Sequence, residues 1–307
     1  MGMDTAPEQP GGAAPVGYLG PEGTFSEEAL LASAADGAVA PVASPTIYDT
    51  VVALRRGEVR WAIVPIENSL EGPISVTLDL LADDAGDLAI VGEAVLRVSH
   101  ALIAAERIAL AEVKTVMTHP QVPGQCTQLL RGELAAARVL PASSTAEAVR
   151  LVLAEGDRGA AAIGTTLAAR IYGGVVLRAA VEDRPDNETR FVWLARTAAT
   201  AAAAPPPLRE AGAAWKTSLV FWGLGAERPG WLVRCLDEFA RREINLTKIE
   251  SRPRRERLGS YMFFADLAGR HDEQPVSEAI AGLGALCEEV RVLGSYPAAV
   301  RAGPGAG

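Results

Sequence analysis

A proline-rich break constrains this chain more than any other feature, because it divides the sequence into two unequal parts. Residues 196–215 read RTAATAAAAPPPLREAGAAW, and three consecutive prolines cannot continue a helix. A segment so rich in alanine and proline is typical of a linker. We therefore expect a large unit over residues 16–196, a linker over 197–215 and a small unit over 216–297. Residues 1–15, rich in Pro, Gly and Ala, are expected to form a disordered tail.

Short apolar segments alternate with helical segments along the large unit. RWAIVPIE is typical of a buried strand, and the ISVTLDLLAD that follows it has a helical pattern. The alternation continues through VKTVMTH, PGQCTQLLRGEL, ARVLPASS, TAEAVRLVLAEG, AAAIGT and TLAARIYG. Strands that alternate with helices in this way predict an α/β fold.

The small unit has a different order of elements. The six elements expected there are a strand over 217–224, a helix over 230–242, strands over 244–252 and 259–268, a helix over 275–285 and a strand over 288–295. This βαββαβ order predicts the ferredoxin-like split βαβ arrangement.

Charge and composition narrow the class of ligand. The chain has a formal net charge of -9 at pH 7, and only 5% of its residues are aromatic. An acidic chain lacks the basic face that binds a phosphate backbone, and few aromatic side chains leave few platforms on which bases could stack. We therefore expect no nucleic-acid partner.

The cysteines are few and widely spaced. Cys126, Cys235 and Cys287 form neither a disulfide framework nor a CxxC pair, and the histidines form no HExxH cluster. This pattern favours a metal-free protein of the reducing cytoplasm. The N-terminus lacks the pattern of a secretion signal, and no apolar run reaches the ~20 residues that span a bilayer. We therefore expect no membrane association.

The glycine-rich turn GPEGTF leads into the first expected helix. Thr24 precedes the apolar periodic segment and Glu27 follows three residues later, which is the spacing of a capping box. Backbone N–H groups at this helix start, reached through Gly20 and Gly23, could also hold an anion. The spacing alone favours capping.

Polar side chains also follow several other strands of the large unit. In α/β folds, ligands bind at the carboxyl ends of strands, although each such residue can equally cap the next helix. Cys126, close to His119, invites interpretation as a nucleophile, but a lone cysteine is more often a small buried hydrophobe. The polar residues at these strand ends are Asn68, Ser69, Thr118, Gln125, Ser144 and Thr145.

The segment DNETRFVWL adds a hydroxyl and a charge at one more strand end. Thr189 and Arg190 stand where a polar turn meets an apolar strand. Together these strand ends offer neutral hydrogen-bond donors and one arginine, without an evident pair of catalytic carboxylates. Such a site suits a small anionic ligand and chemistry that depends on orientation and proton donation.

Seven segments, in order, resemble the prephenate dehydratases that carry a C-terminal ACT domain. They are GYLGPEGTFSEEA, VPIENSLEGPI, THPQVPGQC, STAEAV, AAIGTTLAARIYG, DNETRF and INLTKIESRP, and the resemblance covers roughly residues 16–297. It implies an α/β catalytic domain with two subdomains, of the periplasmic-binding-protein-like type II, and an active site between them. The small unit would be a ferredoxin-like ACT domain.

The resemblance also implies a reaction and its residues. Prephenate would become phenylpyruvate, water and carbon dioxide without a cofactor. Thr189 of the TRF segment would donate to the departing hydroxyl, Arg190 would balance substrate charge or tie down the strand, and Phe191 would wall the pocket. Asn68, Ser69, Thr118 and Gln125 would bind substrate, and Ser144, Thr145 and Thr24 would hold its carboxylates.

A regulatory site and an oligomer are further implications of the resemblance. Phenylalanine, or another aromatic amino acid, would bind the ACT domain of a homodimer or homotetramer. Two departures from the family pattern stand out: Thr118 replaces the usual serine, and Trp231 replaces the usual alanine beside the effector site. The effector-binding residues would be Gly230, Trp231, Leu232, Asn245, Leu246, Glu250, Ser251 and Arg252.

Two other functions are compatible with the same segments. Arogenate dehydratases share the motifs and act on the amino analogue of prephenate. A non-catalytic protein that binds or senses a small anion could use the same fold, although the intact TRF segment argues against it. Related prephenate decarboxylases are expected to lack the TRF threonine, so Thr189 argues against that activity as well.

Overall fold

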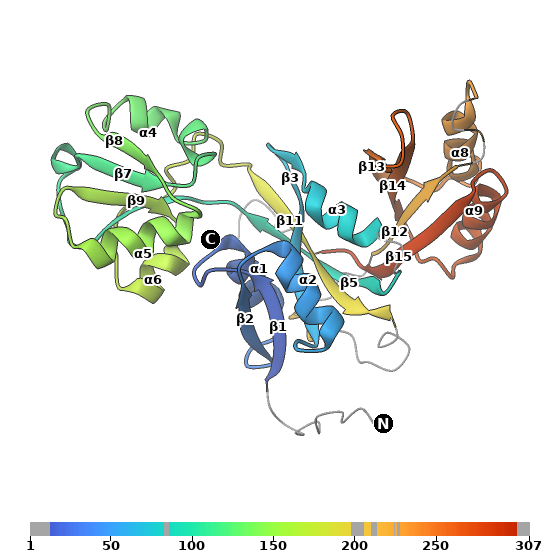
Figure 1. Ribbon diagram of the computed structural model, residues 1–307, viewed down its shortest axis with the longest axis horizontal. Coiled ribbons are helices and arrows are strands. Elements are labelled where there is room, and N and C mark those ends of the chain that lie inside the picture. Colours follow the sequence, from blue (N-terminus) through green and yellow to red (C-terminus); the bar gives the residue numbers. More distant parts are fainter. Residues whose placement is uncertain are drawn as a thin grey trace.

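The computed structural model describes residues 13–82, 86–197, 206–209, 214–223, 225 and 228–299. The described elements form three sheets with helices packed against them (Figure 1). Figure 1 shows the second sheet at one end of the molecule, the first sheet in the middle and the third at the other end. The mixed α/β fold predicted from the alternation of strands and helices is confirmed.

The first sheet has the order β2-β1-β3-β11-β5, and the short β4 pairs with β3. Strand β1 is parallel to β2 and β3, whereas β11 is antiparallel to both of its neighbours. Helix α1 covers one face, and helices α2 and α3 cover the other. The elements are β1 (Ala14–Leu19), α1 (Phe25–Ser33), β2 (Val39–Ser44), α2 (Ile47–Arg56), β3 (Trp61–Asn68), β4 (Gly72–Pro73), α3 (Ser75–Ala82), β5 (Leu88–Arg97) and β11 (Glu188–Arg196).

The second sheet has the order β10-β6-β9-β7-β8. The chain enters it from β5 and returns through β10 to β11, so two connections join this subdomain to the first sheet. Its elements are β6 (Ala101–Ala104), η1 (Leu110–Glu112), β7 (Thr115–Thr118), η2 (Val122–Gly124), α4 (Thr127–Arg131), β8 (Arg138–Pro141), α5 (Thr145–Glu155), β9 (Ala160–Gly164), α6 (Thr166–Tyr172) and β10 (Val175–Arg178).

The third sheet has the order β13-β14-β12-β15, and all of its pairings are antiparallel. The βαββαβ order predicted for residues 216–297 is confirmed. We call this part the C-terminal domain. Its elements are β12 (Trp215–Trp222), α8 (Trp231–Ala240), β13 (Leu246–Pro253), β14 (Tyr261–Ala268), α9 (Gln274–Gly284) and β15 (Glu289–Pro297).

Both faces of the third sheet are covered in its central part. Leu219 and Phe221 of β12 pack against helices α8 and α9. Val220 and Trp222 point the other way and share one hydrophobic core with the first sheet and helices α2 and α3. Because successive side chains of a strand alternate between faces, β12 contributes to both cores.

Strand β15 crosses very close to strand β5 of the first sheet. A Cβ atom built on Gly294 would lie 2.0 Å from the backbone oxygen of Ile90. No side chain fits there, so the two sheets meet backbone against backbone at this point.

A few boundaries differ from those expected. Strand β1 begins at Ala14, so the expected tail of residues 1–15 is too long; its residues 1–12 lie outside the described part. The linker expected over 197–215 lies mostly outside it too, at 198–205 and 210–213. The helix expected from PGQCTQLLRGEL is divided, because a 3-10 turn precedes the short α4. No helix in the described residues is long and apolar enough to cross a membrane.

Candidate active site

Strand β11 presents alternate side chains to opposite faces of the first sheet. Phe191 and Trp193 pack in the core under α1, while Val192 packs in the core shared with the C-terminal domain. By the same alternation, Thr189 lies on the α1 side and Arg190 on the side of the third sheet. Thr189 and Arg190, although adjacent in the TRF segment, therefore face different parts of the molecule.

A chain of hydrogen bonds begins at the Thr189 hydroxyl. Asn68 Nδ2 donates to Thr189 Oγ1 at 2.8 Å and to Asn187 Oδ1 at 2.9 Å. Ser69 Oγ lies 3.3 Å from the same Asn187 oxygen. Thr189 accepts in its contact with Asn68, and no acceptor for its own proton occurs among the described residues. The hydroxyl is thus oriented by the protein with its donor function unused.

Gln125 joins this chain from the second sheet. Asn187 Nδ2 donates to Gln125 Oε1 at 3.3 Å, and Gln125 Nε2 donates to Glu71 at 3.2 Å. The ring nitrogen Nε2 of His100 lies 3.2 Å from the same Gln125 oxygen. Asn68, Ser69, Gln125 and Thr189, all predicted to lie in one site, are therefore brought together.

The protonation of His100 follows from its surroundings. An amide oxygen only accepts hydrogen bonds, so Nε2 of His100 carries the proton that it donates to Gln125. Burial lowers the pKa of His100, although the hydrogen bond to Gln125 and the charge of Glu182 act in the opposite direction. The ring is consequently neutral at pH 7, and Nδ1 has no partner among the described residues.

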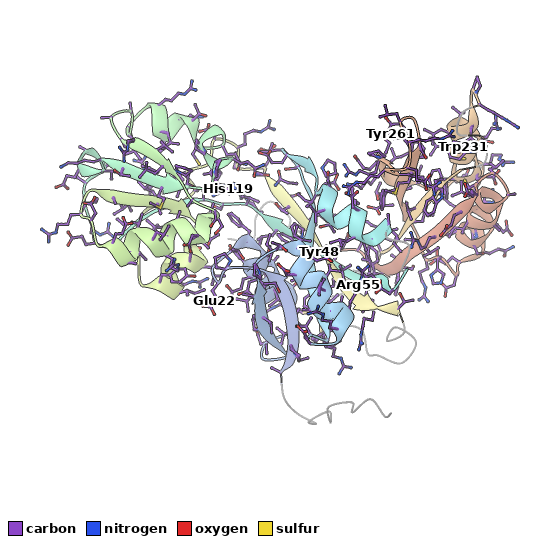
Figure 2. The ribbon with its side chains drawn as sticks, viewed as in Figure 1. Glu22, Tyr48, Arg55, His119, Trp231 and Tyr261 are labelled. Atoms are coloured by element: carbon purple, nitrogen blue, oxygen red, sulfur yellow. The ribbon has the colours of Figure 1, made fainter. Side chains whose placement is uncertain are left out.

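The first and second sheets also touch through the turn after β1. Thr165 Oγ1 donates to the Gly23 carbonyl at 2.6 Å, and the Tyr172 hydroxyl donates to the Glu22 carbonyl at 2.9 Å. Gly23 has φ +83°, and a Cβ there would lie 2.8 Å from Ala168. In Figure 2, Glu22 and His119 both lie where the two sheets face each other.

The predicted capping role of Thr24 is seen at the start of α1. Its Oγ1 accepts from Glu27 N at 3.4 Å and donates to the Leu19 carbonyl at 2.9 Å. The Glu27 carboxylate accepts from the backbone N–H of Gly23, and burial raises the pKa of this carboxyl. The Gly23 N–H considered for anion binding is therefore occupied by the protein's own carboxylate.

Three other predicted substrate-binding residues lie in the second subdomain, and two of them have structural partners for their hydroxyls. Thr118 is 1% exposed and donates to the Ile163 carbonyl at 2.8 Å. Ser144 caps α5 by accepting from Glu147 N at 3.0 Å, and Thr145 is the buried first residue of that helix. The structure records no hydrogen bond between these residues and the hydrogen-bonded series of Thr189, Asn68, Asn187 and Gln125.

The remaining two residues of the TRF segment do not share the setting of Thr189. Phe191 is 1% exposed and packs beside Leu30 and Trp61 in the core of the first sheet, so it supports the strand instead of presenting a ring to an open pocket. Arg190 donates to Glu93, Asp266 and Tyr296 on the opposite face. Of the two roles considered for Arg190, these contacts fit the one in which it ties down the strand.

Several predicted effector-binding residues have other roles in this structure. Trp231 is buried in the core of the C-terminal domain, beside the rings of Phe221 and Phe263, and its indole N–H donates to the Leu286 carbonyl. Arg252 donates to Ser75 and Asp79 of α3, so it links the two domains. Gly230 ends the loop before α8 with φ +76°, and Leu232 follows in the helix. Asn245 and Ser251 are exposed, while Leu246 and Glu250 are partly buried in β13.

Cys126 has the character of a buried core residue. It lies in the core of the second sheet with Leu129 and Val116. Burial, reinforced by the charges of Asp183 and Glu182, raises the pKa of its thiol to about 12. The interpretation of Cys126 as a hydrophobe is the one that the structure favours. Within the described residues, no group of three or more His, Cys, Asp or Glu side chains has the arrangement of a metal site.

Three members of the hydrogen-bonded chain were missed in the sequence. Asn187 lies in the quoted DNETRF segment without an assigned role, and its position two residues before Thr189 was the available signal. His100 and Glu71 carry no local signal, because each acts through a partner far away in the chain, Gln125 in both cases.

Comparison with known proteins places these residues in a family. A family model described as prephenate dehydratase matches residues 16–199. A prephenate dehydratase of Mycolicibacterium vanbaalenii is 40% identical over 295 residues, covering 92% of this chain and 90% of the relative.

Solved structures agree at the level of the whole chain. A prephenate dehydratase from Arthrobacter aurescens, in complex with L-Phe, has a TM-score of 0.80 at 34% identity, covering 92% of this chain and 89% of that one. A protein described as GqqA, a quorum quenching acylase, has a TM-score of 0.79 at 28% identity, with 92% and 98% covered. The match of family model and relatives over most of the sequence shows that this chain belongs to the prephenate dehydratase family.

Proposed function

We propose that this protein converts prephenate into phenylpyruvate, carbon dioxide and water. In this reaction the electron pair of the breaking bond to the ring carboxylate moves into the ring as the C–O bond of the ring hydroxyl breaks. The hydroxide that departs takes up a proton and leaves as water. The protein must therefore orient a dianion and stabilise the departing oxygen.

The unused donor of Thr189 is the observation that carries this proposal. Asn68 fills the acceptor side of the Thr189 hydroxyl, which aims its remaining proton away from Asn68. A donor held in advance of the reaction stabilises charge as it develops on a leaving oxygen. Thr189 is thus assigned to the ring hydroxyl of prephenate.

The neighbouring amides supply orientation. Asn68 is itself fixed, because its Oδ1 accepts from the backbone N–H groups of Leu70 and Glu71, each at 2.9 Å. Gln125 and Ser69 extend the same hydrogen-bonded surface toward the second sheet. We assign substrate contacts to these three side chains and to the start of α5 at Ser144 and Thr145, where the helix dipole favours a carboxylate.

We further propose that the C-terminal domain is a ferredoxin-like ACT domain that binds phenylalanine or another aromatic amino acid. The support is the order of its strands and the L-Phe complex of the Arthrobacter relative. Gly230, Leu232, Asn245, Leu246, Glu250 and Ser251 are the assigned contacts; Trp231 and Arg252 are engaged elsewhere. The catalytic unit would be of the two-subdomain type II binding-protein kind. A homodimer or homotetramer in the cytoplasm, with three buried free thiols, completes the proposal.

The test mixes purified protein with prephenate and follows phenylpyruvate by absorbance. Thr189→Ala should lower kcat by roughly 100-fold or more, the scale of a lost oriented donor. Thr189→Ser keeps the hydroxyl and should retain much of the activity. Thr166→Ala removes a threonine hydroxyl from an exposed residue at the start of α6 and serves as the matched control.

The outcomes separate the proposed function from its alternatives. Near-normal turnover in Thr189→Ala would remove Thr189 from the mechanism. A parallel assay with arogenate distinguishes the related dehydratase activity. Binding of prephenate without any product would instead support a non-catalytic sensor.

A further inference from the structure

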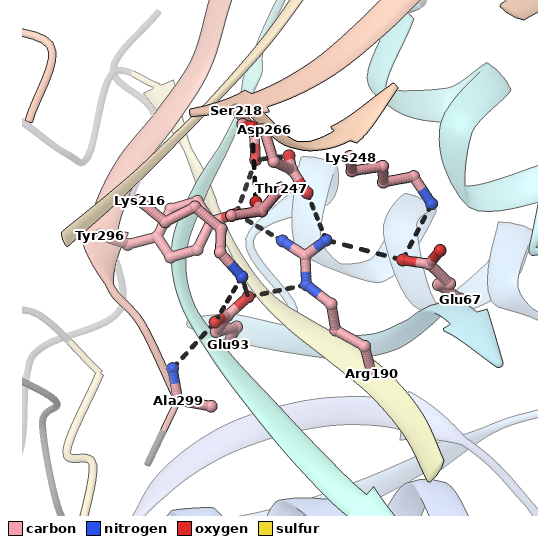
Figure 3. Close-up of polar contacts among 10 residues, drawn as sticks. All are labelled: Glu67, Glu93, Arg190, Lys216, Ser218, Thr247, Lys248, Asp266, Tyr296 and Ala299. Carbon is pink, nitrogen blue, oxygen red and sulfur yellow. Dashed lines mark hydrogen bonds and ion pairs between the residues drawn. The ribbon is translucent and has the colours of Figure 1, made fainter. Parts of the chain in front are cut away.

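Arg190 lies at the centre of a buried polar cluster between the first and third sheets (Figure 3). Its Nε donates to Glu93 at 2.7 Å, and its two terminal nitrogens donate to Asp266 and to the Tyr296 hydroxyl. Only 11% of its side chain is exposed. We call the group the interdomain cluster; its members are Glu67, Glu93, Arg190, Lys216, Ser218, Lys248, Asp266 and Tyr296.

Part of the cluster closes into a ring of hydrogen bonds. Arg190 donates to the Tyr296 hydroxyl, and Ser218 Oγ donates to Asp266, whose other oxygen accepts from Arg190. Because the Ser218 proton is used on Asp266, the contact between Ser218 and Tyr296 at 2.6 Å must use the tyrosine proton. Each hydroxyl in the ring therefore both donates and accepts a hydrogen bond, which strengthens the neighbouring hydrogen bonds.

The charges of the cluster are balanced across the domain boundary. Glu93 binds Lys216 of the C-terminal domain at 2.8 Å as well as Arg190, and Glu67 lies 3.0 Å from Lys248. Three carboxylates thus face three cations. The cluster joins β3, β5 and β11 of the first sheet to all four strands of the third sheet.

The cluster and the candidate active site use the same two strand ends. In the pairing of β11 with β3, Thr189 lies opposite Asn68, and Arg190 lies opposite Glu67. The first pair is hydrogen-bonded in the site. The second pair faces the C-terminal domain, since Arg190 contacts Asp266 and Glu67 contacts Lys248. Each strand therefore offers one residue to the chemistry and the adjacent residue to the other domain.

We propose that Arg190 is a positioning residue through which the C-terminal domain sets the position of the Thr189 hydroxyl. The inference rests on the proposed function, because it presumes that Thr189 acts on prephenate. A shift of the third sheet must either carry the guanidinium and its strand along or leave buried charges unpaired. The second outcome is strongly unfavourable, so the strand follows the domain. A change in the position of the C-terminal domain thereby moves the Thr189 hydroxyl, because Arg190 and Thr189 are adjacent residues of β11.

Tyr296→Phe tests the inference without touching the candidate active site. It removes one oxygen from the ring of hydrogen bonds and keeps the buried aromatic ring in place. Tyr261→Phe is the matched control, since Tyr261 is an exposed tyrosine at the start of β14 in the same domain (Figure 2). Both variants and the wild type are compared by kcat and KM on prephenate at a temperature where unfolding curves show all three to be folded.

Tyr296→Phe should lower kcat about tenfold with KM changed less than about twofold, because the hydroxyl of Thr189 is displaced while the binding amides stay. Tyr261→Phe should match the wild type. Arg190→Lys should lower kcat at least as much, and adding Tyr296→Phe to it should cost little more, because both changes break the same link. If Arg190→Lys fails to fold, Ser218→Ala takes its place in this cycle.

Two results are decisive against the inference. One is a Tyr296→Phe variant whose kcat equals that of Tyr261→Phe; the other is full additivity in the double variant. Either leaves the proposed function intact if the wild type makes phenylpyruvate. A wild type that makes none refutes the proposed function itself, so the two failures are distinguishable.

Discussion

Replacing Glu93 by glutamine should destabilise the protein far more than a single surface change would. Glu93 has a side chain that is only 3% exposed, and it accepts from Arg190 at 2.7 Å, from Lys216 at 2.8 Å and from the Ala299 N–H at 2.9 Å. Glutamine keeps the shape but removes the charge, so Lys216 loses the carboxylate that it contacts and Arg190 keeps only Asp266 as a close anionic partner. The expected effect is a loss of interdomain stability.

The magnitude follows from burial. Removing one partner of a buried ion pair costs ~3–5 kcal/mol. Lys216 is 17% exposed and can recover some hydration, which places the expected loss near the lower end, at about 3 kcal/mol. Total stabilities of ~5–15 kcal/mol make this a large fraction. With a urea dependence of ~3 kcal/mol per molar, the midpoint should fall by about 1 M.

Urea unfolding measured by circular dichroism and by tryptophan fluorescence provides the assay. Glu106→Gln is the matched control, because Glu106 forms an exposed ion pair with Arg158 at 2.6 Å. An exposed pair contributes ~0–1 kcal/mol. Equal midpoints for Glu93→Gln and Glu106→Gln would refute the view that the interdomain cluster holds the domains together.

Four further outcomes follow from the same structure. Burial alone would raise the pKa of Glu93, but the charges of Arg190 and Lys216 outweigh it and hold that pKa below its ordinary value. The Glu93 carboxylate therefore stabilises the folded protein fully above the unfolded-state pKa of ~4.3, and this contribution is lost as the pH falls through the lower pKa of the folded state. Unfolding curves at decreasing pH should show the gap between wild type and Glu93→Gln closing below about pH 4, and a gap independent of pH would contradict this. Asn187→Ala should lower kcat/KM by roughly 10- to 100-fold, because Asn68 and Gln125 lose the amide that joins them; steady-state kinetics on prephenate would detect it, and an unchanged value would exclude Asn187 from the site. Cys126 should resist alkylation by iodoacetamide at pH 8 in the folded protein and react only in urea, as mass spectrometry would show, because its thiol pKa is raised to about 12; rapid labelling of the native protein would disprove the burial argument. Trp231→Ala should destabilise the C-terminal domain by ~3–5 kcal/mol through the cavity it opens, and an unchanged thermal midpoint in calorimetry would show that the ring is not a core residue.

Local sequence patterns predicted the elements well because those patterns are themselves local. Apolar periodicity and capping residues placed α5 and β9, and the prolines marked the end of the large unit. The strand end at Thr189 was also readable, since a polar turn meets an apolar run there. The contacts that join these elements are between residues far apart in the sequence, and such contacts could not be predicted from local patterns.

Arg190 illustrates both the reach and the limit of sequence reasoning. Period-two alternation along a strand already separates Arg190 from Thr189, so the two could have been assigned to opposite faces without a structure. The partners Glu93 and Asp266 could not have been named, because the packing of one sheet on another depends on long-range register. The role of His100 could not be predicted for a similar reason, because its partner Gln125 lies 25 residues away and the fold of the second subdomain brings the two together.

The core shared by the first and third sheets changes what counts as an exchangeable module. Val220 and Trp222 of the C-terminal domain complete a core that begins with Val192 and Leu194 of β11, and Gly294 lets the backbones touch. A chimera that joins the C-terminal domain of a relative to this chain at the linker would therefore contain a mismatched half of this core. The C-terminal domain can be exchanged only together with the surface of the first sheet that it covers. Substitutions on the two surfaces of this shared core are therefore expected to occur as compensating pairs.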